Sequence, residues 1–576
     1  MNFLETTPNK SLRDYTGQAI KEIIKTLIQR KIKSSVGLAK IKREMAKKYK
    51  IPCPNNISLL KTYHEMVKNK RVKLSGKVDE ALASSSASFL LRKNSLIENL
   101  LRTRPIRSLS GIVNISVLTK PYPCPGKCLY CPSEKGIPKS YVSGEPAVER
   151  AKKLDYDPYW QTKKRIEMLK MEGHPTDKIE LRIVGGTWSY YPRQYQIWFV
   201  TRCFAACNAE PHRTIRRTTL KNLEKAQKIN EKAKHRIVGL SVETRPDFIT
   251  ESEIKRLREL GVTMVELGVQ SIYDDVLKIN LRGHGVKETI LATKLLKDAG
   301  FKVLYQMMPN LPGSNLKRDE KIFTELFKNP DFQPDLLKIY PCALLKEAPL
   351  YKLWKEGKYK PYTQSQLIEL IKSIKKRIPY YVRIQRISRD IPSPSIISGP
   401  AKISNLRQIL TKIMEREGWR CKCIRCREVR KTYDPKERIY LFRKDYEASD
   451  GREIFLSFEN ENRTKLYSLL RLRLTSENIA IIREIHTYGQ QLSIIDRFTK
   501  SIISPQHKGL GKKLIKKAEK IAKKDYNPPT TSSHLSKGKR APFGLNKIAV
   551  IAGIGVRDYF KKLGYRLRGT YMVKEL

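Results

Sequence analysis

Three cysteines near residue 128 have the spacing of a metal-cluster loop. They are Cys124, Cys128 and Cys131, spaced Cys-x3-Cys-x2-Cys, with prolines and a glycine between them. A disulfide would pair two of these thiols and leave the third alone, and tetrahedral zinc normally takes a fourth close ligand that the neighbouring sequence lacks. A 4Fe–4S cluster can take three thiolates and leave one iron open to a small molecule. The spacing therefore favours such a cluster, with a zinc knuckle or buried free thiols as the alternatives.

A second group of cysteines, Cys421, Cys423 and Cys426, is even tighter, with the spacing Cys-x-Cys-x2-Cys. Thiols this close in sequence are typical of a metal site and not of ordinary core packing. Zinc (Zn) with a distant residue or solvent as its fourth ligand is the preferred interpretation, and the ion would brace two domains. A second iron–sulfur cluster is the alternative.

A third candidate site is rich in glycine. Gln506, Gly509, Leu510, Gly511 and Lys512 open a helix that we predict for residues 510–523. Unblocked N–H groups and the positive end of the helix dipole favour a pyrophosphate at such a position. Gly-x-Gly alone is a weak signal, but here it follows a predicted β-meander and precedes a predicted strand at 548–552. This order resembles the coenzyme A cradle of GCN5-related (GNAT) acetyltransferases.

The net charge of the chain is +58, from 115 Lys and Arg against 57 Asp and Glu. This excess is more than solubility requires and indicates a polyanionic partner, of which nucleic acid is the first candidate. A lysine-rich composition common to the whole source lineage would explain part of it. Residues 1–105 place Lys and Arg around an apolar stripe of helical spacing, so we predict a basic helical region that binds RNA phosphates. A solvated helical extension is the alternative.

The cysteine usage and the lack of long apolar runs limit the possible locations. Ten cysteines, six of them in two tight groups, predict metal sites in a reducing compartment and not a disulfide framework. The first residues lack an apolar core of signal-peptide length, and no run approaches the ~18 apolar residues of a membrane span. We therefore expect a cytoplasmic protein with no membrane partner.

The elements that position the first three cysteines alternate regularly between strand and helix. Apolar strands are predicted at 111–118, 179–184, 237–242, 264–269, 302–307, 336–340 and 381–387, with amphipathic helices between them. Such alternation predicts parallel strands with right-handed crossovers, and so a full or partial α/β barrel. Chemistry in these barrels lies at the C-terminal ends of the strands. The cysteine loop follows the first strand directly, which strengthens the cluster hypothesis.

Polar residues follow other predicted strands at the same end of the barrel. Gly185, Gly186 and Thr187 end the second strand, where glycines let carbonyl groups approach a bound ammonium group. Glu243 follows the third strand and Gln270 the fourth. We predict that these five residues contact the small molecule on the open iron. A turn with satisfied polar groups is the alternative for each segment.

Four regions follow from these changes in sequence texture. They are a basic helical region (1–105), a barrel (106–400), a zinc-binding linker (401–436) and an acetyltransferase-like α+β domain (437–576). Residues 525–546, rich in Pro, Ser, Thr and Lys, predict a mobile basic insertion in the last domain.

The chain from about Arg104 onward resembles the catalytic subunit of Elongator, a radical S-adenosylmethionine (SAM) family that carboxymethylates uridine in tRNA. The collinear stretches that carry the resemblance include Gly173-His-Pro-Thr-Asp-Lys178, Glu243-Thr-Arg-Pro-Asp, Arg282-Gly-His, Arg483-Glu-Ile-His-Thr-Tyr-Gly and Gly555-Val-Arg-Asp-Tyr-Phe. The resemblance implies that the cluster reduces SAM and that the resulting radical takes hydrogen from the acetyl group of acetyl-CoA. The carbon radical then adds to C5 of the wobble uridine, and hydrolysis of the thioester leaves a carboxymethyl group.

The resemblance also implies site residues. The acetyl-CoA contacts of the family fall on Lys178, Glu484, Ile485, His486, Thr487, Leu510, Gly511, Lys512, Tyr559 and Phe560. Tyr559 and Lys178 are the candidate catalytic residues. The cysteine spacing is the short form of prokaryotic relatives, and Phe560 replaces the second tyrosine of a family pair, which removes one candidate proton donor. His486 is either an acetyl-CoA contact or the missing zinc ligand.

The expected partner is tRNA, bound through its anticodon stem-loop, and the sequence leaves a homodimer or accessory subunits open. The alternative function is a protein lysine acetyltransferase in which the iron–sulfur cluster is structural. Dependence on SAM separates the two functions.

Overall fold

The computed structural model describes residues 10–32, 34–75, 95–212, 218–475, 479–492, 494, 504–524 and 547–576. The chain forms two compact units. The first comprises residues 1–109, 164–176 and 493–499, and the second comprises 110–163, 177–492 and 500–576. Among the described residues, no helix is both long enough and apolar enough to cross a bilayer. The insertion predicted at 525–546 lies outside the described residues.

The first unit is a helical bundle with a core of its own. The apolar stripe predicted from the sequence is buried, since Ile23, Ile24 and Leu27 are at most 1% exposed and pack against Leu59 and Tyr63. Lysines on the opposite face of the first helix are exposed. The helices are α1 (Lys10–Gln29), α2 (Ser35–Lys48), α3 (Asn56–Ser75), α5 (Ser95–Leu101) and the C-terminal part of α7 (Pro158–Met171).

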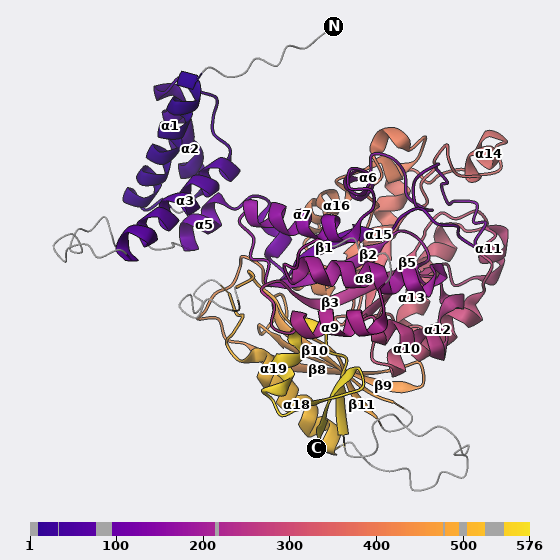
Figure 1. Cartoon of the computed structure of the whole chain (residues 1–576). Helices are drawn as coiled ribbons and strands as arrows, with labels where there is room; N and C mark the ends of the chain where they lie inside the picture. Colours follow the sequence, from indigo (N-terminus) through magenta and orange to yellow (C-terminus); the bar gives the residue numbers. More distant parts are fainter. Residues whose placement is uncertain are drawn as a thin grey trace. The chain divides into compact units, whose positions relative to one another are not determined.

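The second unit begins with a sheet of seven parallel strands that pair in chain order (Figure 1). The first and last strands do not pair with each other, so the sheet is an open half-barrel. This confirms the predicted partial barrel. The strands are β1 (Val113–Leu118), β2 (Lys178–Val184), β3 (Arg236–Thr244), β4 (Met264–Gln270), β5 (Lys302–Met307), β6 (Leu336–Ile339) and β7 (Arg383–Arg386).

Helices connect consecutive strands, as parallel pairing requires. Several begin at a residue whose side chain caps the first turn, as Thr363 does for α15 by accepting a hydrogen bond from the Gln366 N–H group. The main connecting helices are α8 (Arg193–Cys207), α9 (Leu220–Asn230), α10 (Glu251–Glu259), α11 (Asp274–Ile279), α12 (Val286–Asp298), α13 (Leu316–Lys328) and α15 (Gln364–Arg377).

The second sheet, orange to yellow in Figure 1, is mixed. Its strand order is β13-β14-β12-β11-β10-β9-β8, and only the β11–β12 pair is parallel. The strands are β8 (Tyr440–Ala448), β9 (Gly451–Glu459), β10 (Leu466–Leu474), β11 (Ala480–Thr487), β12 (Lys547–Val550), β13 (Arg566–Arg568) and β14 (Tyr571–Glu575).

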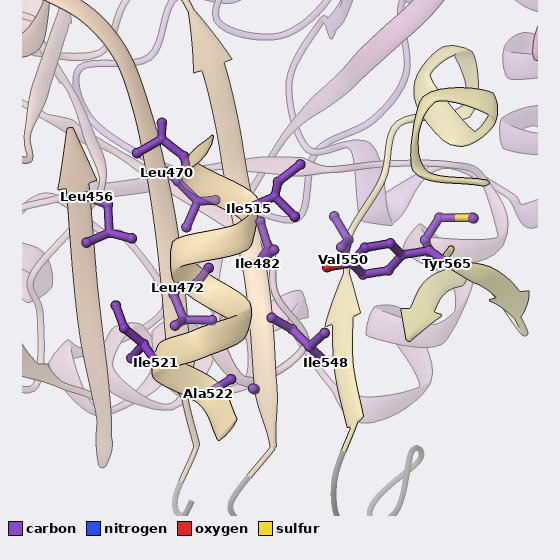
Figure 2. Packing of buried hydrophobic residues seen from close by; sticks show 14 of the residues in the cluster. Leu456, Leu470, Leu472, Ile482, Ile515, Ile521, Ala522, Ile548, Val550 and Tyr565 are labelled. Atoms are coloured by element: carbon purple, nitrogen blue, oxygen red, sulfur yellow. The ribbon is translucent and has the colours of Figure 1, made fainter. Parts of the chain in front are cut away.

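Helix α18 (Leu510–Lys524) lies across one face of this second sheet. Figure 2 shows Ile515 and Ile521 of the helix directed at Leu472 and Ile482 of the strands, and all four are at most 5% exposed. This packing fixes the N-terminal end of α18, which carries the glycine-rich motif, against β11.

Buried arginines join the second sheet to the half-barrel. Arg483 of β11 donates two hydrogen bonds to Asp335, at 2.8 and 2.6 Å, and Arg473 of β10 donates two to Asp298, at 2.9 and 2.6 Å. Asp335 immediately precedes β6, and Arg483 also donates to the carbonyl of Phe301, just before β5. The second sheet therefore contacts the half-barrel at the N-terminal ends of its strands, opposite to the cysteine loop.

Candidate active site

The cysteine loop leaves the C-terminal end of β1 and contacts the turn that follows α11. The Leu129 N–H donates to the carbonyl of Asn280 at 3.2 Å. From the same turn the buried Arg282 reaches the loop, with its Nη1 atom 3.5 Å from the sulfur of Cys128. A Cβ atom at Gly126 would lie 2.5 Å from Arg245 Nη1, so the loop passes close to this guanidinium. Two arginines thus face the cysteine loop.

The three cysteines open on one cavity at the C-terminal ends of the strands. Gly186, Thr187, Glu243 and Gln270 line it together with the cysteines, as the sequence predicted. The Thr187 hydroxyl lies 3.7 Å from the sulfur of Cys124. Gly185 lies just outside the cavity lining, and its carbonyl accepts hydrogen bonds from Thr119 and Tyr191, each at 3.2 Å. Gly185 therefore supports the cavity wall without lining it. The other four of the five residues predicted to contact the small molecule line the cavity.

Glycine is obligatory at the end of β2 for a conformational reason. Gly185 and Gly186 have φ values of 134° and 102°, in the region that side chains disfavour. A Cβ atom at Gly185 would also lie 1.9 Å from the hydroxyl of Thr119.

The residues around the cavity suit an iron–sulfur cluster better than a single ion. Four thiolates around one zinc at about 2.3 Å stand about 3.8 Å apart. Among the described residues, Cys124, Cys128 and Cys131 do not gather within 4.8 Å of one another, so they surround a larger object. Three buried atoms near the cysteines, Arg245 Nη1, Arg282 Nε and Gln270 Oε1, have no hydrogen-bond partner among the described residues. Unpaired buried N–H groups beside thiolates fit an anionic cluster, and the free Gln270 oxygen fits a ligand that donates a hydrogen bond.

The interior of the half-barrel below the cavity is charged. Glu243 accepts hydrogen bonds from Lys338 at 2.8 Å and from the hydroxyl of Tyr141 at 3.0 Å. Glu266 contacts Lys338 and accepts a hydrogen bond from Arg182 at 2.8 Å. Burial alone would raise the pKa of Glu266, but Arg182 and Lys338 lower that pKa to about 2. Glu266 is therefore ionised, and this ion-pair ladder holds Glu243 in place.

The predicted coenzyme A cradle lies where two strands of the second sheet separate. β11 pairs with β12 only over Ala480–Ile482, and its remaining residues extend past the last pair. Ile485, on that free stretch, and the hydroxyl of Tyr559 both lie 3.4 Å from the Cβ position of Gly511. Burial raises the pKa of Tyr559 to about 12, so its hydroxyl stays protonated at neutral pH. The helix start, Tyr559 and the free stretch of β11 therefore surround one site.

Lys178, the first residue of β2, meets the glycine-rich motif from the half-barrel side. Its Nζ atom donates to Oε1 of Gln506 at 2.6 Å. The same Gln506 amide accepts from the Leu492 N–H and donates to the carbonyls of Gly111 and Thr487. The side chain of Gln506 thus makes four hydrogen bonds within the protein, and it positions Lys178 where the sequence predicted a cofactor contact.

Comparisons with known proteins agree with this geometry. The model of the Radical SAM superfamily matches residues 122–326, and that of the Radical_SAM C-terminal domain matches residues 334–416. A tRNA uridine(34) acetyltransferase from Methanocaldococcus infernus is 46% identical over 499 residues, which cover 83% of this chain and 88% of the relative. The Elongator complex protein 3 of Homo sapiens is 38% identical over 500 residues, 83% of this chain and 86% of its own.

The chain belongs to the Elongator protein 3 (Elp3) family. A solved archaeal Elp3 from Methanocaldococcus infernus, with residues 1–46 deleted, is 44% identical and has a TM-score of 0.67. The match covers 81% of this chain and 100% of that one. This confirms the family that the sequence motifs indicated.

The second cysteine group of this Elp3-family chain is compact. The sulfurs of Cys421, Cys423 and Cys426 all lie within 4.8 Å of one another, and this is the one such group of metal-ligand atoms among the described residues. That spacing fits a single tetrahedral ion. The segment contacts both sheets. The Ile424 N–H donates to the carbonyl of Val382, just before β7, at 3.0 Å, and Glu428 forms an isolated backbone β-bridge with Leu466 of β10.

His486 is not part of this cysteine group, so its alternative role as the missing zinc ligand is wrong in this structure. Its Nε2 atom lies 2.6 Å from the carbonyl of Ser110, and its ring stacks on Tyr488 with centroids 4.3 Å apart.

The acetyl-CoA contact that the resemblance implies for His486 stays a prediction, whereas the side chains of Phe560 and Glu484, two further implied contacts, are engaged elsewhere in the protein. Phe560 is 1% exposed and packs in the core of the second sheet, so its side chain does not reach the cradle. Glu484 forms ion pairs with Lys302 at 3.3 Å and Arg471 at 2.8 Å, on the half-barrel side of β11. These partners hold the pKa of Glu484 well below its usual value despite its burial. Glu484 therefore belongs to the join between the sheets.

The sequence reasoning missed Arg245, Arg282 and Lys338 as site residues. Arg245 and Arg282 occur in the family stretches Glu243-Thr-Arg-Pro-Asp and Arg282-Gly-His, which were the available signal. Lys338 stands in an apolar strand, where a lone lysine that is only 3% exposed indicates a paired charge.

Proposed function

We propose that this protein is an acyltransferase that converts the wobble uridine of tRNA to 5-carboxymethyluridine with acetyl-CoA and SAM. The observation that carries the proposal is that one compact unit holds both a three-cysteine cavity and the glycine-rich start of α18, which Lys178 of the half-barrel contacts through Gln506. Relatives named tRNA uridine(34) acetyltransferase support the nucleotide, and the net charge of +58 suits an RNA substrate.

At the cavity, Cys124, Cys128 and Cys131 would hold the 4Fe–4S cluster and leave its fourth iron to SAM. When bound, the cluster and SAM supply a radical that removes hydrogen from the acetyl methyl group. Gly186, Thr187 and Gln270 would orient SAM from the cavity wall. Glu243 would accept hydrogen bonds from substrate hydroxyl or amino groups, because Lys338 and Tyr141 already fix its carboxylate.

At the cradle, the N–H groups at the start of α18 would hold the pyrophosphate of coenzyme A. Lys178 would bind the acyl end as a cation. The protonated Tyr559 hydroxyl would protonate the coenzyme A thiolate as it withdraws to the cradle after hydrolysis. The lack of a hydroxyl at Phe560 removes no group from the cradle, because that ring is buried in the core.

The two sites lie at opposite ends of the half-barrel, so the acyl group must cross its length. Lys178 begins β2, whereas Val184, at the other end of that strand, pairs with the residue of β1 from which the cysteine loop departs. A seven-residue strand spans about 20 Å. The cavity extends from the cysteines down to Glu266 and Gln306. We infer that the acyl end of acetyl-CoA passes Lys178 and enters the half-barrel toward these residues.

Three further assignments belong to this proposal. Cys421, Cys423 and Cys426 bind a structural zinc ion that ties β7 to β10 through the segment they occupy. The basic helices of the first unit bind tRNA phosphates. The enzyme works in the cytoplasm, where reducing conditions keep the cysteine thiolates free for metal.

Isotope transfer tests the proposal. Anaerobically reconstituted protein is incubated with tRNA, SAM, reductant and acetyl-CoA that carries a trideuterated acetyl group. We expect 5-carboxymethyluridine with two deuterium atoms and 5′-deoxyadenosine with one, both measured by mass spectrometry. The Cys128→Ala variant should form neither product, because its cluster lacks a ligand.

The same experiment separates the alternative function. A protein lysine acetyltransferase would transfer all three deuterium atoms to lysine and would not require SAM. SAM-independent acetylation together with unmodified tRNA would overturn the proposal.

A further inference from the structure

A second pocket lies on the outer side of the cysteine loop. It has a volume of about 640 Å³ and is open to solvent. Its walls are the loop residues Pro125–Lys127, the side of α11 that carries Asp274 and Lys278, and the turn after this helix, including Leu281 and Arg282. Only Gly126 and Arg282 line both this pocket and the three-cysteine cavity. The loop that would hold the cluster is therefore a thin wall between an inner site and an outer one.

The turn that forms this outer pocket exposes aliphatic side chains. Leu281, which lines the pocket, is 51% exposed, and Ile279, the last residue of α11 and outside the pocket lining, is 48% exposed. Leu281 also has a φ of 52°, a left-handed conformation that a bulky residue rarely adopts. This backbone conformation directs Leu281 to solvent while the next residue, Arg282, points inward to Cys128. Leu281 therefore gives the mouth of the pocket an exposed aliphatic group that a bound partner would cover.

The outer pocket is also mainly basic. Lys127 and Lys278 are exposed at its rim, and Asp274 is the single carboxylate among its lining residues. The Asp274 carboxylate accepts a hydrogen bond from the Val286 N–H at 2.8 Å. This bond connects the first residue of α11 to the first residue of α12 and so stabilises the turn between them. A small apolar patch with a basic rim complements an acidic protein surface.

We propose that this outer pocket is the docking site of an acidic one-electron carrier protein that reduces the cluster. The inference rests on the proposed function, since that chemistry consumes one electron at the cluster for each SAM cleaved. The carrier is oxidised by one electron, the cluster is reduced by one, and no proton or covalent bond changes at this step. A carrier on the outer side of the cysteine loop approaches the cluster while SAM and substrate occupy the inner cavity.

An electron carrier fits this surface better than RNA does. Surfaces that bind single-stranded RNA combine basic residues with aromatic rings on which bases stack. The lining of the outer pocket contains no Phe, Tyr or Trp, its one aromatic ring is the half-buried imidazole of His284, and its exposed large apolar side chain, Leu281, is aliphatic. Transient redox complexes use small interfaces steered by charge, which is what this pocket offers.

The test measures the rate of cluster reduction with flavodoxin hydroquinone as the probe, in a stopped-flow spectrometer at low ionic strength. We expect the Lys127→Glu/Lys278→Glu variant to be reduced roughly tenfold or more slowly, since steering charges change association rates by 10- to 10³-fold. Leu281→Asn should weaken saturation by flavodoxin roughly tenfold, because asparagine buries less apolar surface against the carrier. Asparagine tolerates the left-handed backbone, so this variant should keep the turn.

Matched variants on the second sheet domain serve as controls. Lys516→Glu/Lys517→Glu reverses two exposed charges, and Leu567→Asn replaces a leucine that is 40% exposed. Both should be reduced at the wild-type rate. A photoreduced deazaflavin, which is uncharged, should reduce all variants equally and support equal SAM cleavage.

Three outcomes would overturn the inference. If flavodoxin reduces the pocket variants at the wild-type rate, the pocket is not its docking site. If the pocket variants bind a labelled anticodon stem-loop RNA more weakly while flavodoxin still reduces them normally, the surface belongs to RNA. If deazaflavin reduces no cluster even in the wild-type protein, the proposed function fails as well.

Discussion

The ammonium group of Lys178 donates a 2.6 Å hydrogen bond to the side-chain oxygen of Gln506, although 328 positions separate them. This bond joins the first residue of a barrel strand to the motif that opens α18. Because Gln506 is held by three further hydrogen bonds, the position of Lys178 is fixed before any cofactor binds. Lys178 is therefore a preorganised cation at the boundary of the two proposed sites.

The first prediction concerns the pH dependence of acetyl-CoA binding. Burial lowers the pKa of Lys178 to about 8, although neighbouring Asp177 opposes the shift. His507 is close enough that Lys178 lowers its pKa as well. We expect the dissociation constant of acetyl-CoA to rise as pH increases through 8, because Lys178 loses its charge. Isothermal titration calorimetry between pH 6.5 and 9.5 measures this.

The Lys178→Gln variant should bind acetyl-CoA roughly 10- to 100-fold more weakly, the effect of one charge-assisted hydrogen bond. The acetyl-CoA affinity of Lys178→Gln should stay constant as pH increases through 8. The affinity of Lys512→Gln should still fall over that range, because Lys178 is intact. SAM binding should be unaffected in both. If the acetyl-CoA affinity of Lys178→Gln still falls as pH increases through 8, another group is responsible for the pH dependence.

The second prediction concerns the join between the two sheets. Asp335 and Arg483 are both fully buried, and two hydrogen bonds of 2.8 and 2.6 Å connect them. Asp335→Ala leaves the charge of Arg483 without its main partner, so we expect a loss of about 3–5 kcal/mol in the free energy of unfolding. Urea denaturation followed by tryptophan fluorescence measures the loss.

Asp275→Asn is the matched control, because it removes an exposed carboxylate that pairs with Arg318. This variant should unfold like the wild type. Equal stability of Asp335→Ala and Asp275→Asn would show that the buried pair does not hold the sheets together.

The third prediction concerns the compact cysteine group. Elemental analysis of the purified protein should find one zinc ion per chain in addition to the iron of the cluster. Cys423→Ser should lose the zinc and lower the melting temperature while the cluster absorbance remains, since metal-binding energy at a structural site is folding energy. Cys128→Ala should show the converse pattern. Loss of iron in place of zinc from Cys423→Ser would identify a second iron–sulfur cluster.

The fourth prediction concerns the basic helices of the first unit. Lys21, Lys25, Lys40 and Lys47 are exposed there, so glutamine at these positions should not disturb the core. We expect weaker tRNA binding and a salt dependence whose logarithmic slope falls by about 0.7–0.9 for each phosphate that the variant no longer neutralises. Fluorescence anisotropy at several salt concentrations measures both. Four glutamines at the exposed Lys513, Lys516, Lys517 and Lys520 of α18 form the control, and an equal effect of the two sets would remove the helices from tRNA binding.

The sequence alone determined those features whose signals are local. Alternating apolar strands and amphipathic helices predicted the half-barrel, because side-chain periodicity depends on each element by itself. The spacing of Cys124, Cys128 and Cys131 likewise predicted a loop that surrounds one object. The glycine motif at Gly509 and Gly511 predicted the helix start, because backbone freedom there is a property of a few adjacent residues.

Only the tertiary structure decided which side chains share a site. Arg282 meets Cys128 across 154 positions, and Arg483 meets Asp335 across 148. The register between β10 and β11 shifts at Arg471, so the pattern of alternation along β11 did not reveal that Glu484 faces the half-barrel while Ile485 faces Gly511. Burial removed Phe560 from the cradle for the same reason. Such contacts depend on how two sheets pack, and no periodicity within one segment encodes the packing of another.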